Sequence, residues 1–376
     1  MFRKIFTLFK LDNKNILIFA YSQILILFVY KNSYVNNFGD HYHLILDIFR
    51  RNEVIYDAHP ESPLFTIIGL IFSFQNFYIY GLLVYFVSSL LIFQVFKNLS
   101  FLEGNLIYLL LHGWLITISW WMGYVDIFTI FFSSVLIKLS KTNDVSLNKI
   151  FIVSAIMSFN HFGLGVIMLS IVFLLFYKLS FKLISRSFVG IIFGSVLNSL
   201  YLILIKYDFE DTRISYVQNI DIVINNSLST FNNFGFVINS GFYIFSLIIV
   251  YLIVTKKIKI NSFIIFGLLI AILGSSILYD TSRYFSILSL PVIIKFIEIN
   301  KVTLSKIKYK EFLILFSIFW PLSVEVYLMV LCFKKSLLKS MRILLSYAST
   351  GKILHLIWVP AAMSESNTAS VDGFTI

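Results

Sequence analysis

The feature that most constrains this chain is a succession of long apolar runs separated by short clusters of lysine and arginine. A run of about 20 apolar residues is long enough for a helix to cross a bilayer, and shorter runs suffice where the protein shields a broken helix. Charged residues make up 13% of the sequence, against roughly 25% in soluble domains. The sequence therefore predicts an all-α, polytopic helical bundle in a membrane, with roughly ten to twelve membrane segments, some of them short or re-entrant.

The charge balance and the motif content argue against several function classes. The net charge is +11, but the basic residues lie between apolar runs, as in cytoplasmic loops of membrane proteins, which makes nucleic-acid binding a poor interpretation. Cys332 is the single cysteine, which rules out an internal disulfide and a cysteine-based metal site. The sequence contains neither a P-loop nor a dinucleotide-binding glycine motif. The chain is therefore not expected to bind a nucleotide as its own energy source.

The distribution of charge also predicts the orientation of the chain. Basic residues precede the first apolar run, at 16–30, and place the N-terminus in the cytoplasm. The polar segments 31–62 and 206–235 are acidic in balance and are expected to be outer loops of one transmembrane domain, 1–347. The polar stretch near the end predicts a loosely ordered tail at 348–376. A single last crossing would place the basic cluster after residue 333 outside, so either the final segment is re-entrant or an earlier crossing is miscounted.

Two apolar runs are interrupted by polar residues. Residues 106–138 are too many for one helix and too few for two full ones, and the break at 122–126 predicts a tight hairpin with its tip outside. The run 150–177 is broken at 160–163 and forms either one helix with polar residues or two short helices. In the next run, Gly190 and Gly194 have a spacing that permits close helix contact, and a packing role is expected.

Polar residues gather at the predicted outer ends of the helices. A charge at the bilayer centre costs on the order of 3 kcal/mol, so such residues usually face a cavity or the interface. Contact with water explains why each of these residues, taken alone, is polar. Because all of them lie at the same predicted face of the membrane, a shared site is favoured. The residues are Asp40, His41, His43, Asp126, Asn160, His161, Asp280 and Arg283.

The first outer loop holds a candidate general base. The carboxylate of Asp40, partly desolvated at the bilayer surface, would accept a proton from a hydroxyl. His41 and His43 would bind a divalent metal only if the backbone is extended, because residues two apart on a helix point to different sides. Interfacial histidines are the simpler interpretation, and no metal ligand is assigned.

A second candidate group would bind phosphate. Asp280 and Arg283 lie about one helical turn apart and would either pair with each other or share a ligand. The planar guanidinium suits the phosphate of a lipid-linked sugar donor and would stabilise charge on the leaving group. Arg50 and Arg51 would do the same.

The residues that break the apolar runs have two interpretations each. Asp126 is either a functional acid or the cap of the hairpin, whereas for His161 a satisfied interhelical hydrogen bond is favoured over a functional role. Trp114, Trp120 and Trp121 are expected first as anchors at the membrane interface, and they would stack on sugars only if they line a cavity.

Several short segments at these positions resemble GT-C-type glycosyltransferases of the bacterial envelope, multi-span enzymes that use polyprenyl-phosphate donors outside the inner membrane. The resemblance implies that Asp40 is the catalytic base and that Arg283 contacts the donor phosphate. The chain lacks the soluble domain of many members, and only Asp47 and Asp57 are candidates for a second acid on the first loop. The segments are Gly-Asp-His-Tyr at 39–42, Ser-Pro-Leu at 62–64, Gly-Tyr-Val-Asp at 123–126, Asn-His at 160–161 and Asp-Thr-Ser-Arg at 280–283.

The same features resemble O-antigen and exopolysaccharide polymerases, which handle pyrophosphate-linked oligosaccharides with outer arginines and histidines. That resemblance gives Arg50, Arg51 and Arg213 larger roles in substrate binding. Both families imply transfer of a polyprenyl-(pyro)phosphate-linked saccharide to an acceptor hydroxyl on the periplasmic side, with donor, acceptor, bilayer and other glycan-assembly proteins as partners. The polymerase form is preferred because the chain is compact and its outer loops are large.

A transporter or flippase of lipid-linked saccharides is the alternative from another class. Transporters tend to place charges and broken helices near the midplane, often in repeated halves. Here the charges lie at one predicted face and no internal repeat is visible, which favours an enzyme. A purely structural membrane protein would need none of the outer acids.

Overall fold

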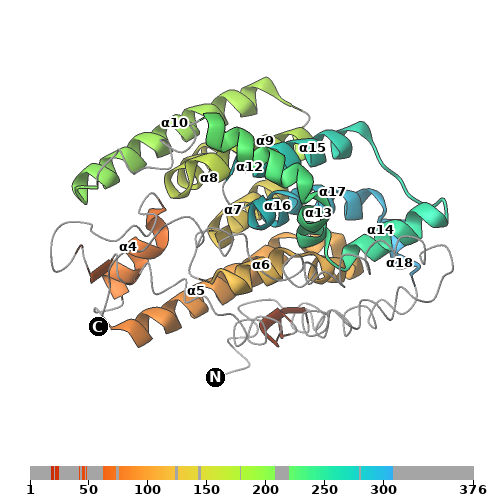
Figure 1. Ribbon diagram of the computed structural model, residues 1–376, viewed down its shortest axis with the longest axis horizontal. Coiled ribbons are helices and arrows are strands. Elements are labelled where there is room, and N and C mark those ends of the chain that lie inside the picture. Colours follow the sequence, from red (N-terminus) through yellow and green to blue (C-terminus); the bar gives the residue numbers. More distant parts are fainter. Residues whose placement is uncertain are drawn as a thin grey trace.

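The computed structural model describes residues 62–307 except 73–75, 123–125, 143–144, 178, 208–219 and 279–280, together with residues 18–20, 22–24, 42, 45, 46 and 48. Within that part of the chain the elements are helices and there is no β-strand, which confirms the all-α prediction (Figure 1). Several predicted site residues and the predicted tail lie outside the described residues. The site residues concerned are Asp40, His41, His43, Arg50, Arg51, Arg213 and Asp280.

The described part of the chain consists mainly of helices. In chain order they are α4 (Pro63–Phe72), α5 (Phe77–Asn98), the 3-10 helix η1 (Ser100–Leu111), α6 (Trp114–Trp120), α7 (Asp126–Leu139), α8 (Leu147–Asn160), α9 (Phe162–Phe176), α10 (Phe181–Leu204), α12 (Ile220–Asn232), α13 (Phe234–Phe242), α14 (Phe245–Val254), α15 (Ser262–Ile277), α16 (Thr281–Leu288), α17 (Leu290–Ile299) and α18 (Lys301–Ser305).

Two of these helices, α5 with 22 residues and α10 with 24, are long and apolar enough to cross a membrane by length and composition. Other apolar helices, such as α9 and α15, have between 10 and 17 residues. The predicted count of ten to twelve crossings is therefore not confirmed within the described residues. The outer face of α10 is apolar and exposed, with Phe188, Ile192 and Val196 each about half exposed, a pattern typical of a surface that contacts lipid or a partner.

The Gly190 and Gly194 pair packs α10 against α8, as the sequence predicts. A Cβ atom at Gly190 would lie 2.5 Å from the backbone oxygen of Phe151, and one at Gly194 would lie 2.1 Å from that of Ala155. Both distances are far shorter than any Cβ contact allows, so only glycine permits this approach. Hydroxyl pairs continue the contact, with Ser154 and Ser187 at 2.7 Å and Ser158 and Ser195 at 2.9 Å.

The predicted breaks in the apolar runs are present. α6 ends at Trp120 and α7 begins at Asp126, the last residue of the break predicted at 122–126. In the run 150–177, α8 ends at Asn160 and α9 begins at Phe162, so the structure selects two short helices over one.

A further break, at Gly113, brings the start of α6 against α13. The N–H of Gly113 donates to the backbone oxygen of Gly241 at 2.8 Å, and a Cβ atom at Gly113 would lie 1.8 Å from the oxygen of Ser240. A side chain at this position would push the two backbones apart.

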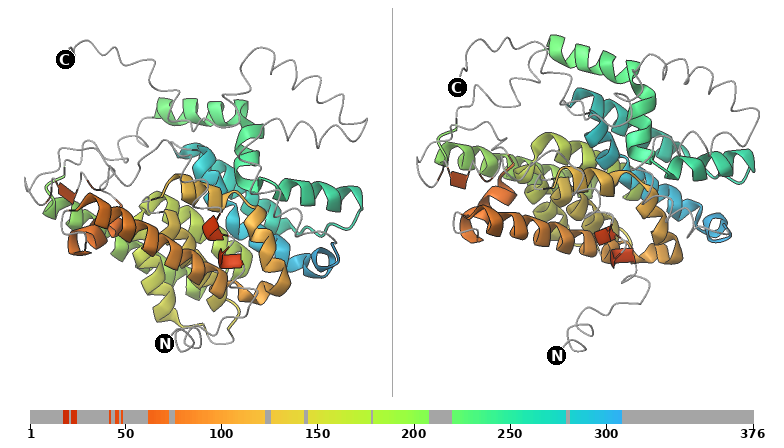
Figure 2. Two further views of the ribbon diagram at one scale, coloured as in Figure 1. Left: turned by 90° about the horizontal axis from the view of Figure 1, so that it is seen from below. Right: turned by 60° about the horizontal axis from the view of Figure 1, so that its bottom comes forward.

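The short helix α16 lies inside the bundle, in contact with α6, α9, α13 and α15 (Figures 1 and 2). Of its eight residues, seven are buried, including Arg283 and Ser286. Burying a polar group costs free energy unless the group is hydrogen-bonded. The buried polar side chains of α16 therefore need hydrogen-bond partners inside the molecule.

Candidate functional site

The centre of the site is a buried ion pair between Arg283 on α16 and Asp126 at the start of α7. Nε of Arg283 donates to Oδ2 of Asp126 at 2.6 Å, and Nη2 donates to Oδ1 at 3.3 Å. The two side chains are 5% and 0% exposed. Two residues that the sequence marks as functional candidates, 157 positions apart, thus lie in direct contact.

Aromatic rings cover the guanidinium of Arg283. Its Cζ atom lies 4.8 Å from the ring centroid of Trp121 and 5.0 Å from that of Tyr284. A cation over the face of an aromatic ring is attracted by the ring quadrupole, and the attraction is strongest where water is excluded. The carboxylate of Asp126 and the two rings together allow a charged side chain to be buried here.

His161 joins this group through Tyr284. Its Nδ1 accepts a hydrogen bond from the backbone N–H of Leu164 at 3.3 Å, which caps the start of α9. In the neutral ring the proton is therefore on Nε2, which donates to the hydroxyl oxygen of Tyr284 at 3.3 Å. This contact confirms the interhelical hydrogen bond expected for His161.

A row of polar side chains continues from Arg283 along the same face of α16 and into the start of α17. Ser286 and Thr117 are joined by their hydroxyl oxygens at 2.6 Å, and Ser289 lies 3.0 Å from Nε2 of His112. Positions 283, 286 and 289 are three apart and so share one helix face. Sequence reasoning missed this row, and the three-residue spacing of polar side chains is the signal that would have revealed it.

The tryptophan prediction is wrong for Trp114. Its side chain is fully buried, and its Nε1 donates to the backbone oxygen of Leu109 at 2.9 Å, so it is a core residue and not an interface anchor. A buried tryptophan needs a partner for its N–H, and the 3-10 helix η1 provides one. Trp121, in contrast, lies against Arg283.

The described residues contain no group of three or more histidine, cysteine, aspartate or glutamate side chains arranged to hold a metal ion. His41 and His43, the metal alternative on the first outer loop, are outside this part of the chain. Among the predicted site residues, the structure brings together Asp126, His161 and Arg283. The alternative pairing of Arg283 with Asp280 involves a residue outside the described part of the chain.

The arrangement is suited to binding an anion. A guanidinium that holds a carboxylate through two hydrogen bonds has the geometry to hold a phosphate in the same way. An incoming phosphate would compete with Asp126 for the same N–H groups, and a displaced Asp126 would become a carboxylate able to accept a proton.

Comparison with models of known protein families, with curated proteins and with solved structures found no match for this chain.

Proposed function

We propose that this chain is a multi-pass protein of the bacterial inner membrane that transfers a polyprenyl-(pyro)phosphate-linked saccharide to an acceptor hydroxyl on the extracytoplasmic side. The observation that supports it is the contact between Asp126 and Arg283. Tyr284, whose ring lies against Arg283, connects this pair to His161 through a hydrogen bond. These residues come from separate segments of the sequence, each of which breaks or borders an apolar run. Ionisable residues inside a helical membrane bundle are costly and usually mark a functional site.

Arg283 binds the donor phosphate in this proposal. When the bond between the sugar and the phosphate breaks, negative charge builds on the phosphate oxygens. The guanidinium therefore binds the transition state more strongly than the ground state, which is the condition for catalysis. Asp126 holds Arg283 in position before the donor arrives.

Two carboxylates, those of Asp40 and Asp126, are available to accept the proton of the acceptor hydroxyl in this proposal. The acceptor oxygen forms a bond to the anomeric carbon, the bond from that carbon to the phosphate oxygen breaks, and the acceptor proton passes to a carboxylate. Asp40 on the first outer loop is the proposed base, as the resemblance to GT-C enzymes implies. Asp126, once displaced from Arg283, is the second carboxylate of the site.

We prefer the polymerase form of this reaction, in which the transferred saccharide is an oligosaccharide repeat. The predicted outer loops at 31–62 and 206–235 supply further cations for a pyrophosphate, namely Arg50, Arg51 and Arg213. Two phosphate groups carry more charge than one arginine neutralises, which gives these additional arginines a role.

The test is complementation of a deletion strain with single variants, read from the surface polysaccharide on a gel. Arg283→Lys is expected to lose most of the glycan, because an ammonium does not reproduce a two-bond contact to phosphate. Asp40→Asn is expected to abolish it, because the base is removed while the shape is kept. Normal glycan in either variant would overturn the role assigned to that residue.

A matched control is Arg186→Lys. Arg186 on α10 also lies over an aromatic ring, with Cζ 4.8 Å from the centroid of Phe151, but its partner is the neutral side chain of Asn148 at 3.2 Å. This variant is expected to keep its glycan. Each variant is first shown to be inserted and monodisperse by size-exclusion chromatography.

A further inference from the structure

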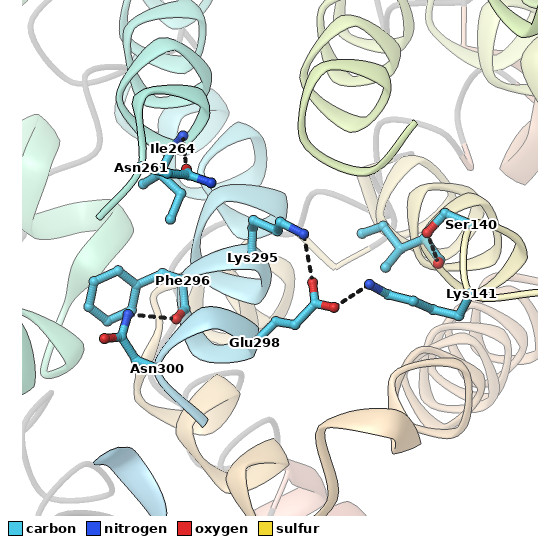
Figure 3. A network of polar contacts seen from close by, with 9 residues as sticks. Ser140, Lys141, Asn261, Ile264, Lys295, Phe296, Glu298 and Asn300 are labelled. Atoms are coloured by element: carbon cyan, nitrogen blue, oxygen red, sulfur yellow. Dashed lines mark hydrogen bonds and ion pairs between the residues drawn. The ribbon is translucent and has the colours of Figure 1, made fainter. Parts of the chain in front are cut away.

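A second charged cluster lies away from the Asp126–Arg283 pair, where α7 and α17 end (Figure 3). The carboxylate of Glu298 lies between two ammonium groups: Lys141 pairs with Oε1, and Nζ of Lys295 is 3.0 Å from Oε2. The three side chains are 30%, 20% and 28% exposed, so water reaches them only in part. We call Lys141, Lys295 and Glu298 the lysine cluster.

The lysine cluster holds two like charges over one aromatic ring. Nζ of Lys141 is 5.4 Å from the centroid of Phe176, and Nζ of Lys295 is 5.2 Å from the same centroid. Lys141 also lies 5.2 Å from the centroid of Phe101. Among the described residues of this cluster, one carboxylate faces two ammonium groups, so the three side chains together carry a net charge of +1.

The hydrogen-bonding capacity of the lysine cluster is also incompletely used. Each ammonium has three N–H donors, and Glu298 accepts one from each. Burial raises the pKa of Glu298, but the hydrogen bonds and charges of Lys141 and Lys295 outweigh it and hold the pKa below its ordinary value. Glu298 therefore stays ionised, and the remaining N–H donors of the two partly exposed lysines are available to water or to a further acceptor.

Charged residues of both signs lie near the lysine cluster in the chain: besides further lysines, Glu103 follows Phe101 by two residues, and its Oε1 lies 2.8 Å from Nζ of Lys301. Nζ of Lys138 lies 3.4 Å from Oδ1 of Asn98, a neutral partner, and Lys97 precedes Asn98 at the end of α5. Large apolar side chains are exposed close to Phe176 in the chain: Leu179 is 51% exposed and Phe181 is 84% exposed. Positive charge beside exposed apolar surface fits a molecule that has an anionic head and apolar chains.

We propose that the lysine cluster binds the phosphodiester headgroup of an anionic phospholipid. The inference rests on the membrane location proposed above but not on glycan transfer. The phosphate oxygens accept the N–H donors of Lys141 and Lys295 that Glu298 leaves, and the acyl chains lie along the apolar surface near Phe181. Juxtamembrane lysines attract anionic lipids in this way.

The experiment measures thermal stabilisation of the delipidated protein in neutral detergent by added phosphatidylglycerol, phosphatidylcholine or inorganic phosphate. The intact chain is expected to be stabilised by phosphatidylglycerol alone, and Lys141→Gln/Lys295→Gln is expected to need at least about tenfold more lipid for the same shift. The control Lys149→Gln/Lys182→Gln removes the same charge from two exposed lysines and is expected to respond as the intact chain does.

Several outcomes would overturn the proposal. Equal stabilisation by phosphatidylcholine would show that the headgroup charge is not recognised, and equal stabilisation by inorganic phosphate would identify a free anion as the ligand. An unchanged response in the double glutamine variant would remove the lysine cluster from the binding site.

A second variant keeps the test decisive if the double glutamine variant does not fold. Glu298→Gln removes the internal competitor for the two ammonium groups, so it is expected to bind phosphatidylglycerol at least as tightly as the intact chain does. Loss of binding in this variant would show that the lysines serve Glu298 and not a lipid. Because the assay uses purified protein without saccharide, its failure would leave the glycan-transfer proposal untouched.

Discussion

Replacing Asp126 with asparagine would leave the guanidinium of Arg283 buried without a counter-charge. Removal of one partner from a buried ion pair typically costs about 3–5 kcal/mol, because the other charge stays in a poorly solvated place. Arg283 is 5% exposed, so water does little to compensate. The rings of Trp121 and Tyr284 remain over the guanidinium and contribute on the order of 1 kcal/mol each.

The asparagine variant is therefore expected near the lower end of that range, at about 3 kcal/mol. The carboxamide oxygen also keeps one of the two hydrogen bonds to Arg283. With an unfolding entropy of about 2.1 cal/mol/K per residue, 1 kcal/mol corresponds to about 1.4 °C in Tm for the predicted domain 1–347, so the expected decrease is about 4 °C.

The assay is the fraction of monodisperse protein that remains after heating in detergent, measured by size-exclusion chromatography. Asp221→Asn is the control, since Asp221 is an exposed acid in the first turn of α12 and its replacement should change stability by less than about 0.5 kcal/mol. The double variant Asp126→Leu/Arg283→Met removes both charges and should be milder than either single substitution at the two positions.

Two results would contradict a stabilising ion pair between Asp126 and Arg283. An unchanged Tm in Asp126→Asn would show that the guanidinium is solvated or finds another partner. A double variant whose loss equals the sum of its single substitutions would show that the two side chains do not stabilise each other.

Three further predictions concern packing and hydrogen bonds. Gly194→Ala is expected to cost about 1–3 kcal/mol, because its Cβ would lie 2.1 Å from a backbone oxygen of α8, whereas Gly104→Ala meets nothing within 4 Å and should not lower the Tm through a clash. The pKa of Glu298 is lowered in the folded protein, so its ion pairs stabilise the protein above the unfolded pKa, and this contribution disappears as the pH falls through the folded pKa. Glu298→Gln should therefore flatten the acid side of a plot of Tm against pH. An unchanged plot would contradict this. Tyr284→Phe removes the hydroxyl partner of His161 and should lower stability by about 0.5–1.5 kcal/mol, measurable as a small decrease in Tm; no decrease would show that the contact is not stabilising.

Local features of the fold were predictable from the sequence because they have local causes. Polar residues that interrupt apolar runs mark the ends of helices, and the breaks before Asp126 and at His161 appear where the sequence places them. The spacing of Gly190 and Gly194 predicts a close helix contact. It does not identify α8 as the partner, since that depends on how the helices are arranged.

The contacts of the site depend on that arrangement and were beyond sequence reasoning. Asp126 and Arg283 meet only because α7 and α16 bring them together across 157 positions. Ser286 was missed because helical serines commonly bond to their own backbone, as its Oγ also does to the oxygen of Arg283 at 2.9 Å. Trp114 was misplaced because composition does not distinguish an interfacial tryptophan from a core one.

The proposed transfer of a lipid-linked saccharide is best measured by the length distribution of surface polysaccharide in a strain that lacks the gene, with and without the intact chain. Without the chain the glycan is expected to be shortened, and the intact chain is expected to restore its length. Acceptor with one complete repeat would identify a polymerase, and a truncated repeat would identify a transferase of a single sugar. A length distribution that is the same with and without the chain would contradict the claim.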